Sequence, residues 1–196
     1  MARPRQFDEK HVIRAVREQF WNAGYAATSL EDLMRVSGLG KGSLYAAFGD
    51  KHQLFLRALR SYNDANDSAL RKLLESAPRA VDALRAFVMA PVRDASGTAA
   101  QRGCLMANST YELAAADPEL LEEARRTYEA TTAALAECLV RAQGEGDVPA
   151  DADPTDTARA LLAAQQGITF MGRTGLDITA LTAAARSLTA QLLPHA

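Results

Sequence analysis

Apolar residues recur every three or four positions along almost the whole chain, which is the spacing that an amphipathic helix requires. Residues 11–24, HVIRAVREQFWNAG, follow this pattern and end in a glycine, a common helix stop. Residues 28–38, TSLEDLMRVSG, place Thr28 and Glu31 at the spacing of a capping box and also end in a glycine. A long helix followed by a short one is therefore predicted.

The next segment predicts a third, short helix and a long fourth one. The third helix covers about residues 40–47 and is closed by Phe48 and Gly49, and Asp50 is placed to cap the fourth. The apolar residues of the fourth helix are Leu54, Phe55, Leu59, Tyr62, Leu70, Leu73 and Leu74. They share one face, through which this helix is expected to pack.

Proline and glycine divide the rest of the chain. A fifth helix is expected after Pro78 and is predicted to stop near Met89, ahead of Pro91. The polar, glycine-containing stretch 91–103 predicts a loop, and a sixth, short helix is predicted to begin near Cys104.

Two aspartate–proline pairs mark further helix starts. In Asp117-Pro118 and Asp153-Pro154, an N-cap residue precedes a proline at the first helical position. The last helix is predicted over about residues 177–193 and ends at a proline. Because no segment shows strand alternation, the sequence predicts an all-α fold of about nine helices.

Composition excludes several classes of protein. With 196 residues, 48% of them hydrophobic, the chain can bury a core and is expected to be soluble. Two cysteines rule out a disulfide framework, and the N-terminus lacks the apolar core of a secretion signal. No apolar run reaches the ~20 residues of a membrane span. We therefore expect a cytoplasmic protein.

Charge is distributed unevenly along the chain. Residues 1–60 contain ten Lys/Arg and six Asp/Glu, a balance of +4, whereas the remainder contains twelve and eighteen, a balance of −6. A basic front end favours a polyanionic partner for that part alone, although a solvated helix face gives the same count.

Residues 38–51, GLGKGSLYAAFGDK, contain three glycines within five positions, although glycine costs a helix about 1 kcal/mol relative to alanine. Two short helices joined by SGLG indicate a helix-turn-helix, whose second helix enters a DNA major groove. Leu44 and Phe48 are expected to face inward, while Gly40 and Gly42 let the backbone approach phosphates. The glycines are thus interpreted as a DNA-binding feature.

Residues 25–55 closely resemble the DNA-binding domain of TetR-family transcriptional regulators, and the match spans roughly the first 55 residues. The matching positions are Phe20, Gly24, Tyr25, Thr28, Leu33, Gly38, Lys41, Gly42, Ser43, Leu44, Tyr45, Phe48, Lys51 and Leu54. The resemblance implies a homodimer that places one recognition helix of each protomer in a major groove. It also implies a three-helix DNA-binding domain over residues 1–50 and a helical effector-binding and dimerisation domain over residues 51–196.

The DNA contacts expected from this pattern are made by Thr28, Lys41, Gly42, Ser43, Tyr45, Ala46 and Lys51. Family members commonly carry aromatic or histidine residues at the two positions after the tyrosine, where this chain has Ala46 and Ala47. More of the specificity is then expected from Lys41, thymine methyl groups and DNA shape. Arg3 and Arg5 form either a minor-groove arm or a disordered basic tail.

An effector site is expected in the helical body. Four residues fall on one helical face at i, i+4, i+7 and i+8, and they are Cys104, Asn108, Tyr111 and Glu112. Other walls of the pocket are predicted from Met89, Met106, Tyr128, Phe170 and Met171. The alternative is that these are ordinary core residues, with Asn108 and Glu112 bonded to nearby backbone.

Cys104 has three interpretations. It is a small buried hydrophobe, or, as the resemblance allows, a sensor of electrophiles or oxidants placed beside Arg102 and a helix N-terminus. The third interpretation, a catalytic nucleophile, finds no support because His11, His52 and His195 are scattered. No catalytic, metal or cofactor site is predicted, and the chain is not expected to be an enzyme.

The last two helices, within residues 156–175 and 178–193, are rich in alanine and leucine. Small residues let helices approach closely, which suits either a dimer interface or an internal pair within one protomer, and the family resemblance favours the dimer interface. The chain is interpreted as a ligand-responsive DNA-binding regulator, a repressor released from a palindromic operator by a small-molecule effector. The alternative is a helical small-molecule carrier whose DNA-binding domain is vestigial.

Overall fold

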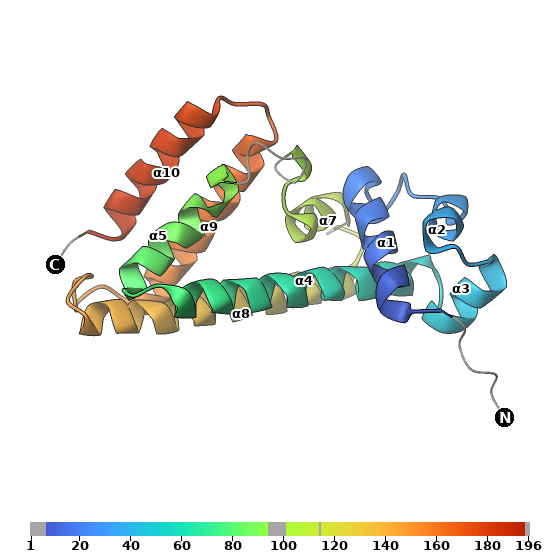
Figure 1. Ribbon diagram of the computed structural model, residues 1–196, viewed down its shortest axis with the longest axis horizontal. Coiled ribbons are helices and arrows are strands. Elements are labelled where there is room, and N and C mark those ends of the chain that lie inside the picture. Colours follow the sequence, from blue (N-terminus) through green and yellow to red (C-terminus); the bar gives the residue numbers. More distant parts are fainter. Residues whose placement is uncertain (1–6, 94–100, 114, 195–196) are drawn as a thin grey trace. The chain divides into compact units, whose positions relative to one another are not determined.

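The computed structural model describes residues 7–93, 101–113 and 115–194. Over these residues the chain forms nine helices and no strand (Figure 1). The helices are α1 (Glu9–Ala23), α2 (Leu30–Ser37), α3 (Lys41–Phe48), α4 (Lys51–Ser76), α5 (Ala80–Arg93), α7 (Leu105–Leu113), α8 (Pro118–Gly144), α9 (Pro154–Gly172) and α10 (Ile178–Leu192). The prediction of an all-α fold with about nine helices is confirmed.

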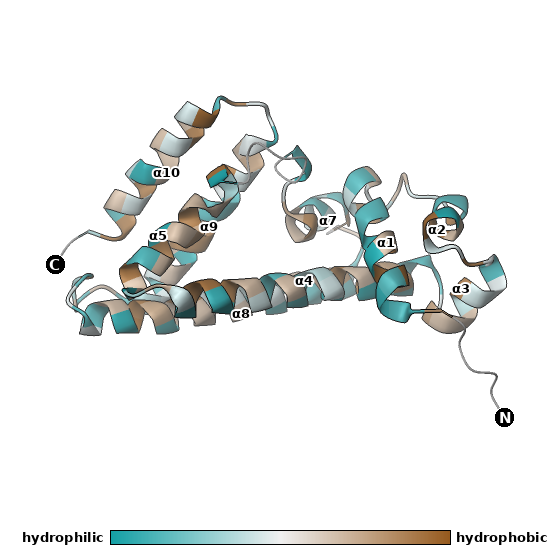
Figure 2. Cartoon of the chain, viewed as in Figure 1, coloured by the Kyte–Doolittle hydropathy of each residue, from teal (hydrophilic) through white to brown (hydrophobic). Residues whose placement is uncertain are grey.

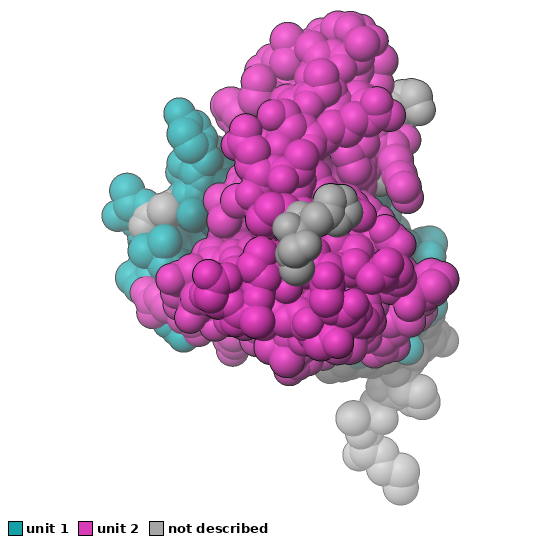
Figure 3. All heavy atoms as spheres, turned by 90° about the vertical axis from the view of Figure 1, so that its left-hand side faces the viewer, with its two compact units in different colours: residues 1–65, 105–123 teal, residues 66–104, 124–196 magenta. Residues whose placement is uncertain are grey.

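The chain packs as two compact units, which are coloured separately in Figure 3. Unit 1 contains residues 1–65 and 105–123, and unit 2 contains residues 66–104 and 124–196. Helices α4 and α8 each begin in unit 1 and end in unit 2. This division follows packing, and the functional boundary expected after residue 50 stays a prediction.

Unit 1 is built around side chains from α1, α2, α3 and the first half of α4. The side chains that are at most 1% exposed include Val12, Val16, Phe20, Leu33, Leu44, Phe48, Leu54, Phe55 and Leu59. The rings of Phe20 and Phe55 meet edge to face with centroids 5.1 Å apart, which adds to the apolar burial. Figure 2 shows hydrophobic and hydrophilic positions along α1 and α4, as expected for helices that bury one side.

Helix α2 begins one residue later than the sequence pattern predicts. Ser29 is the N-cap, because its Oγ accepts a hydrogen bond from the Asp32 N–H at 3.1 Å and the Asp32 carboxylate accepts one from the Ser29 N–H at 3.0 Å. Thr28 is engaged elsewhere, since its buried hydroxyl donates to the Gly24 carbonyl oxygen at 2.7 Å. The predicted capping box of Thr28 and Glu31 is therefore wrong by one position.

Helix α5 does not stop before its proline. It continues through Pro91 to the end of its range, and Val92 in this last turn is only 8% exposed. A proline lacks one backbone N–H, so only the bond to the Phe87 carbonyl is lost, and burial of Val92 offsets that loss. The predicted helix end near Met89 is wrong. The predicted loop is wrong at residues 91–93 and at Gln101 and Arg102, which are helical, and residues 94–100 of that loop lie outside the described residues.

The helix starts predicted at the aspartate–proline pairs are confirmed. The Asp117 carboxylate accepts a hydrogen bond from the Leu120 N–H at 3.0 Å as α8 begins. The Asp153 carboxylate accepts one from the Asp156 N–H at 2.8 Å as α9 begins. Asp177 caps α10 in a similar way.

The core of unit 2 lies among α5, α9 and α10, which pack against one another, and the parts of α4 and α8 in this unit (Figure 1). Its most buried members include Leu84, Val88, Leu135, Leu139, Leu161 and Ala185. Among the described helices, none combines the length and apolarity needed to span a membrane.

Candidate nucleic-acid interface

Helices α2 and α3 form the predicted helix-turn-helix. α2 ends at Gly38, whose φ of 68° lies in the left-handed region that favours glycine, and α3 begins after Gly40. Leu33 of α2 and Leu44 of α3 are both fully buried, and α2 packs on α1 as well as on α3. The turn is short, and buried side chains fix both of its helices from the inner side.

The outer face of α3 carries most of the residues predicted to contact DNA. Lys41, Gly42, Ser43 and Ala46 are exposed, and Tyr45 is half-buried. The Lys41 ammonium lies 6.0 Å from the centre of the Tyr45 ring, a distance at which a cation and a ring attract each other. The structure thus gathers these five residues on a helix whose opposite side is buried.

The glycines of this segment meet no packing need inside the protein. A Cβ atom added to Gly40 or Gly42 would find no other described atom within 4 Å, and neither residue has a positive φ. Alanine would fit at both positions and would favour the helix by up to about 1 kcal/mol at Gly42. Packing within the described part of the protein therefore does not require a glycine at either position.

Lys51, the first residue of α4, is held over an aromatic ring. Its ammonium lies 4.4 Å from the centre of the Tyr25 ring. Burial, followed by the nearby carboxylates of Asp50 and Asp117, raises the pKa of Tyr25. The Lys51 charge is thus placed at a helix N-terminus, where backbone N–H groups also attract anions.

Thr28 and the N-terminal arginines differ from the other predicted DNA contacts. Thr28 is 1% exposed, and its hydroxyl hydrogen is already donated to the Gly24 carbonyl oxygen. A DNA contact by Thr28 stays a prediction. The arm predicted from Arg3 and Arg5 lies outside the described residues.

Glu112 of α7, assigned by its spacing to an effector site, lies against the turn between α1 and α2. Its carboxylate accepts hydrogen bonds from the N–H of Tyr25 at 3.0 Å and from the N–H of Ala26 at 2.7 Å. A Cβ atom on Gly24 would come within 2.9 Å of the same carboxylate. No sequence signal predicts this contact, because the partners are 86 and 87 residues apart.

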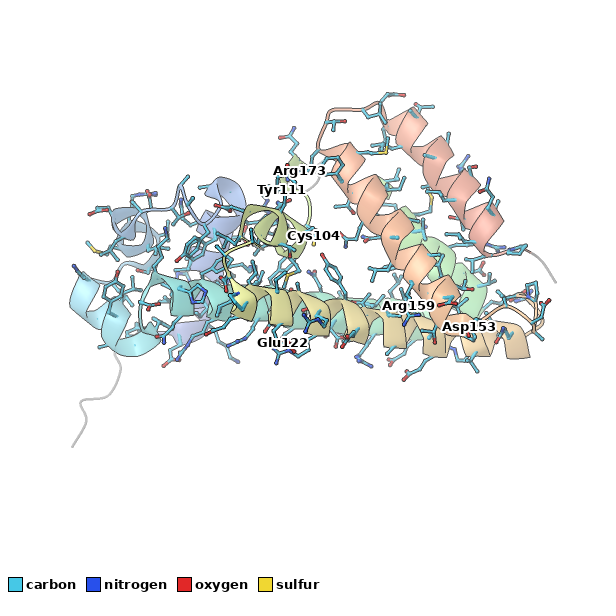
Figure 4. The ribbon with its side chains drawn as sticks, turned by 180° about the vertical axis from the view of Figure 1, so that it is seen from behind. Cys104, Tyr111, Glu122, Asp153, Arg159 and Arg173 are labelled. Atoms are coloured by element: carbon cyan, nitrogen blue, oxygen red, sulfur yellow. The ribbon has the colours of Figure 1, made fainter. Side chains whose placement is uncertain are left out.

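The other predicted residues of α7 do not share the environment of Glu112. Asn108 is half-buried, whereas Tyr111 is 96% exposed and projects from the helix (Figure 4). The N–H of Leu105 at the start of α7 donates to the Tyr62 hydroxyl at 3.3 Å, which ties this helix to α4 within unit 1. Effector binding by these side chains stays a prediction.

Cys104 comes one residue before α7 and belongs to unit 2. Its thiol is free and half-buried. Burial raises the pKa of the Tyr128 phenol, and the proximity of Cys104 raises it further. A Cβ atom on the neighbouring Gly103 would come within 2.5 Å of the Arg173 Cδ, so the Arg173 side chain lies over this backbone (Figure 4).

The remaining predicted effector residues are divided between the units, since Met106 belongs to unit 1 and Met89, Tyr128, Phe170 and Met171 belong to unit 2. Phe170 is 68% exposed near the end of α9, and Met89 lines a cavity between α5 and α10. Within the part of the chain that the structure describes, no cluster of three or more His, Cys, Asp or Glu side chains is placed to hold a metal ion.

Two family models match the chain. Residues 12–58 match the model described as bacterial regulatory proteins, tetR family. Residues 80–188 match the tetracyclin repressor-like, C-terminal domain. The first match covers the helix-turn-helix, and the second covers more than half of the chain.

Two relatives match over most of their length. The uncharacterized HTH-type transcriptional regulator YezE of Bacillus subtilis (strain 168) is 30% identical over 182 residues, which are 92% of this chain and 94% of YezE. The HTH-type transcriptional repressor ComR of Escherichia coli (strain K12) is 27% identical over 180 residues, which are 91% of this chain and 86% of ComR.

Solved structures agree with these matches. A cysteine mutant of the TetR family transcriptional regulator CifR, complexed with 26-bp double-strand operator DNA, has a TM-score of 0.80 and 25% identity, covering 96% of this chain and 98% of CifR. A regulator from Cytophaga hutchinsonii shares the fold, with a TM-score of 0.85 at 18% identity over 97% of this chain and 98% of its own. The chain, with its helix-turn-helix and helical body, belongs to the TetR family of bacterial transcriptional regulators.

Proposed function

We propose that this regulator is a repressor that binds a palindromic operator as a homodimer and leaves it when a small effector binds. The observation that carries the proposal is the outer face of α3, where Lys41 and Ser43 stand exposed beside Gly42 and Ala46. ComR is named a repressor, and CifR has been solved with operator DNA. ComR thus supports the repressor role proposed for this chain, and CifR supports the proposed binding to operator DNA.

In the proposed complex, α3 lies in the major groove. Lys41 and Tyr45 hydrogen-bond to phosphates or base edges, while Ala46 offers a methyl group to thymine. Gly42 permits close approach of the backbone, and Lys51 contacts a phosphate at the start of α4. Because few side chains can bond to base edges, DNA shape supplies part of the specificity.

The last two helices supply the proposed dimer contact. Exposed apolar side chains follow one another where α9 ends and α10 begins: Phe170 (68%), Met171 (41%), Leu176 (41%) and Ile178 (45%). Large apolar side chains grouped in this way commonly mark an interface. A two-fold axis would cover this patch with the same patch of a second copy.

The proposed effector acts through α7. Asn108 and Tyr111 offer an amide and a phenol to a ligand, and Cys104 precedes the same helix. Because Glu112 holds the turn between α1 and α2, a shift of α7 changes the support of the helix-turn-helix. By linkage, an effector that weakens DNA binding binds more weakly to the DNA-bound protein by the same factor. In a second form of this proposal, the effector is an electrophile that reacts with Cys104.

Fluorescence anisotropy with a duplex from the region upstream of the gene tests DNA binding. The wild type is expected to bind with a steep dependence on salt, because bound cations are released from the DNA. Tyr45→Ala and Lys51→Ala are each expected to weaken binding about tenfold, whereas Lys72→Ala, exposed on α4 in unit 2, is the matched control. Equal affinities for all four proteins would contradict the proposal. Ligand binding without any DNA binding would instead favour a carrier.

A further inference from the structure

A cavity of about 310 Å³ lies between α5 and α10 in unit 2. It is lined by Arg85, Met89, Arg186, Thr189, Ala190, Leu193 and Pro194. The lining residues are four apart on α5 and three or four apart along α10, so each helix turns one face to the cavity. This site shares no residue with the outer face of α3 or with α7.

The cavity has an apolar floor and a cationic rim. Leu193 is 1% exposed and Thr189 is 7% exposed, whereas Arg186 and Pro194 are open to solvent. The Thr189 hydroxyl already donates to the Ala185 carbonyl oxygen at 2.6 Å. The floor therefore favours an apolar part of a ligand, and the charged side chains lie only at the rim.

Both arginines of the rim can receive an anion. Within the described part of the chain, Arg186 has no ion-pair partner, and Arg85 has Asp82 at 3.5 Å, which is a long contact between solvent-accessible side chains. A guanidinium is weakly hydrated and matches the two oxygens of a carboxylate. Such a rim repels a cation and gains little from a neutral ligand.

The size of the cavity limits the ligand. At about 30 Å³ for each water-sized group, it holds about ten non-hydrogen atoms. A second charged group on the ligand would have to lie against Met89 or Leu193, whose side chains offer it no opposite charge or hydrogen-bond partner. These limits favour one negative charge at the rim and an unbranched or compact apolar tail.

We propose that this cavity binds a monocarboxylate with an apolar tail of about seven carbons. The carboxylate lies on Arg186 and Arg85, and the tail lies against Met89 and Leu193. The proposal goes beyond DNA binding and does not depend on it, because no residue of the helix-turn-helix takes part.

Calorimetric titration of the full-length protein with sodium octanoate tests the proposal. Octanoate is expected to saturate one site for each protomer. Octan-1-ol should bind at least tenfold more weakly than octanoate, and octylammonium should not bind. Arg186→Gln should weaken the binding of octanoate at least tenfold. Asp82→Asn should strengthen octanoate binding severalfold, because it releases Arg85 from its contact with Asp82. Ala190→Trp should abolish binding of octanoate and octan-1-ol alike, because the indole fills the cavity.

Arg159→Gln is the matched control, since Arg159 is an exposed arginine of α9 outside the cavity (Figure 4). Equal octanoate affinity in Arg186→Gln and Arg159→Gln, binding that does not saturate, or unchanged binding in Ala190→Trp would each overturn the proposal. Thermal melting confirms that each variant is folded, which is expected because positions 186 and 190 are exposed. Operator binding is measured separately, so failure of either proposal is distinguishable from failure of the other.

Discussion

The carboxylate of Glu112 accepts a hydrogen bond from the backbone N–H of Ala26 at 2.7 Å. A second bond, from the N–H of Tyr25, completes the contact at 3.0 Å. The turn that leads into the helix-turn-helix thus has two of its backbone donors satisfied by one side chain of α7. Helix α7 belongs to unit 1, although it follows α5 of unit 2 in the chain.

Replacing Glu112 by alanine should destabilise the protein by about 1 kcal/mol. The two backbone N–H groups lose a charged acceptor, but they gain water because the site is exposed, which limits the loss. Urea denaturation measures the change, with Glu129→Ala, an exposed residue of α8, as control. The contact has no stabilising role if the two variants unfold at the same urea concentration.

Gly24→Ala should be destabilising by about 1–3 kcal/mol. Gly24 has a φ of 81°, which strains any residue with a side chain, and its new Cβ atom would displace the Glu112 carboxylate. Gly167→Ala is the matched control, since Gly167 lies within α9 with open space around it and should gain up to about 1 kcal/mol. Urea midpoints that shift in the same direction for both variants would refute this account.

The Gly24 and Glu112 substitutions should also be coupled. Part of the cost of Gly24→Ala arises from displacing the carboxylate, and that part disappears when Glu112 is alanine. A double-mutant cycle should therefore give an interaction free energy of about 0.5 kcal/mol or more. If the free-energy changes of the two substitutions are strictly additive, the whole cost of Gly24→Ala arises from backbone strain at Gly24.

Several features of unit 1 follow from local sequence, and others do not. The end of α2 at Gly38 and the buried Leu44 and Phe48 are set by glycine and by helical spacing, so the sequence predicts them. The start of α2 depends on whether the Thr28 hydroxyl is already engaged, which only the packing of the preceding turn decides.

The errors elsewhere have the same origin in tertiary contacts. α5 runs past Pro91 because Val92 is buried in its last turn, and a local pattern does not report that burial. The contact between Glu112 and the turn at Ala26 joins residues 86 positions apart. A helical spacing rule can place Glu112 on a face of α7, but it cannot identify what that face meets.

Asp117 gives the protein an acid-sensitive source of stability. Its carboxylate is 12% exposed, accepts the Leu120 N–H at 3.0 Å and lies 2.7 Å from the His52 Nε2. Burial raises the pKa of Asp117, but the bonds from Leu120 and His52 together outweigh burial and hold it below its usual value. A carboxylate with a depressed pKa stabilises the fold above the unfolded-state value of about 3.9 and loses that effect as pH falls through its folded pKa.

Asp117→Asn should therefore lower the urea midpoint at pH 7, and the difference in midpoint from wild type should shrink as the pH falls below about 4. Asp151→Asn, at an exposed turn position, is the control and should follow the wild type throughout. If the difference in urea midpoint between wild type and Asp117→Asn stays constant as the pH falls, Asp117 is not the source of the acid-sensitive stability.

Gly42→Ala should separate stability from DNA binding. The added methyl group meets open space, so the free protein should be stabilised by about 0.5 kcal/mol, measured by thermal melting. The same methyl group faces the proposed DNA and should weaken operator binding about tenfold. If Gly42→Ala binds DNA as tightly as the wild type, close backbone approach is not the purpose of this glycine.

The most direct measurement is the ratio of affinities for the upstream duplex and for a shuffled duplex of the same composition, at about 150 mM salt. If the outer face of α3 reads DNA, the wild type should prefer the upstream duplex by at least about a thousandfold. A variant with both Lys41 and Ser43 replaced by alanine should lose most of that preference while keeping the fold of the wild type. Equal wild-type affinity for the two duplexes, or an unchanged preference in the double variant, would contradict the account.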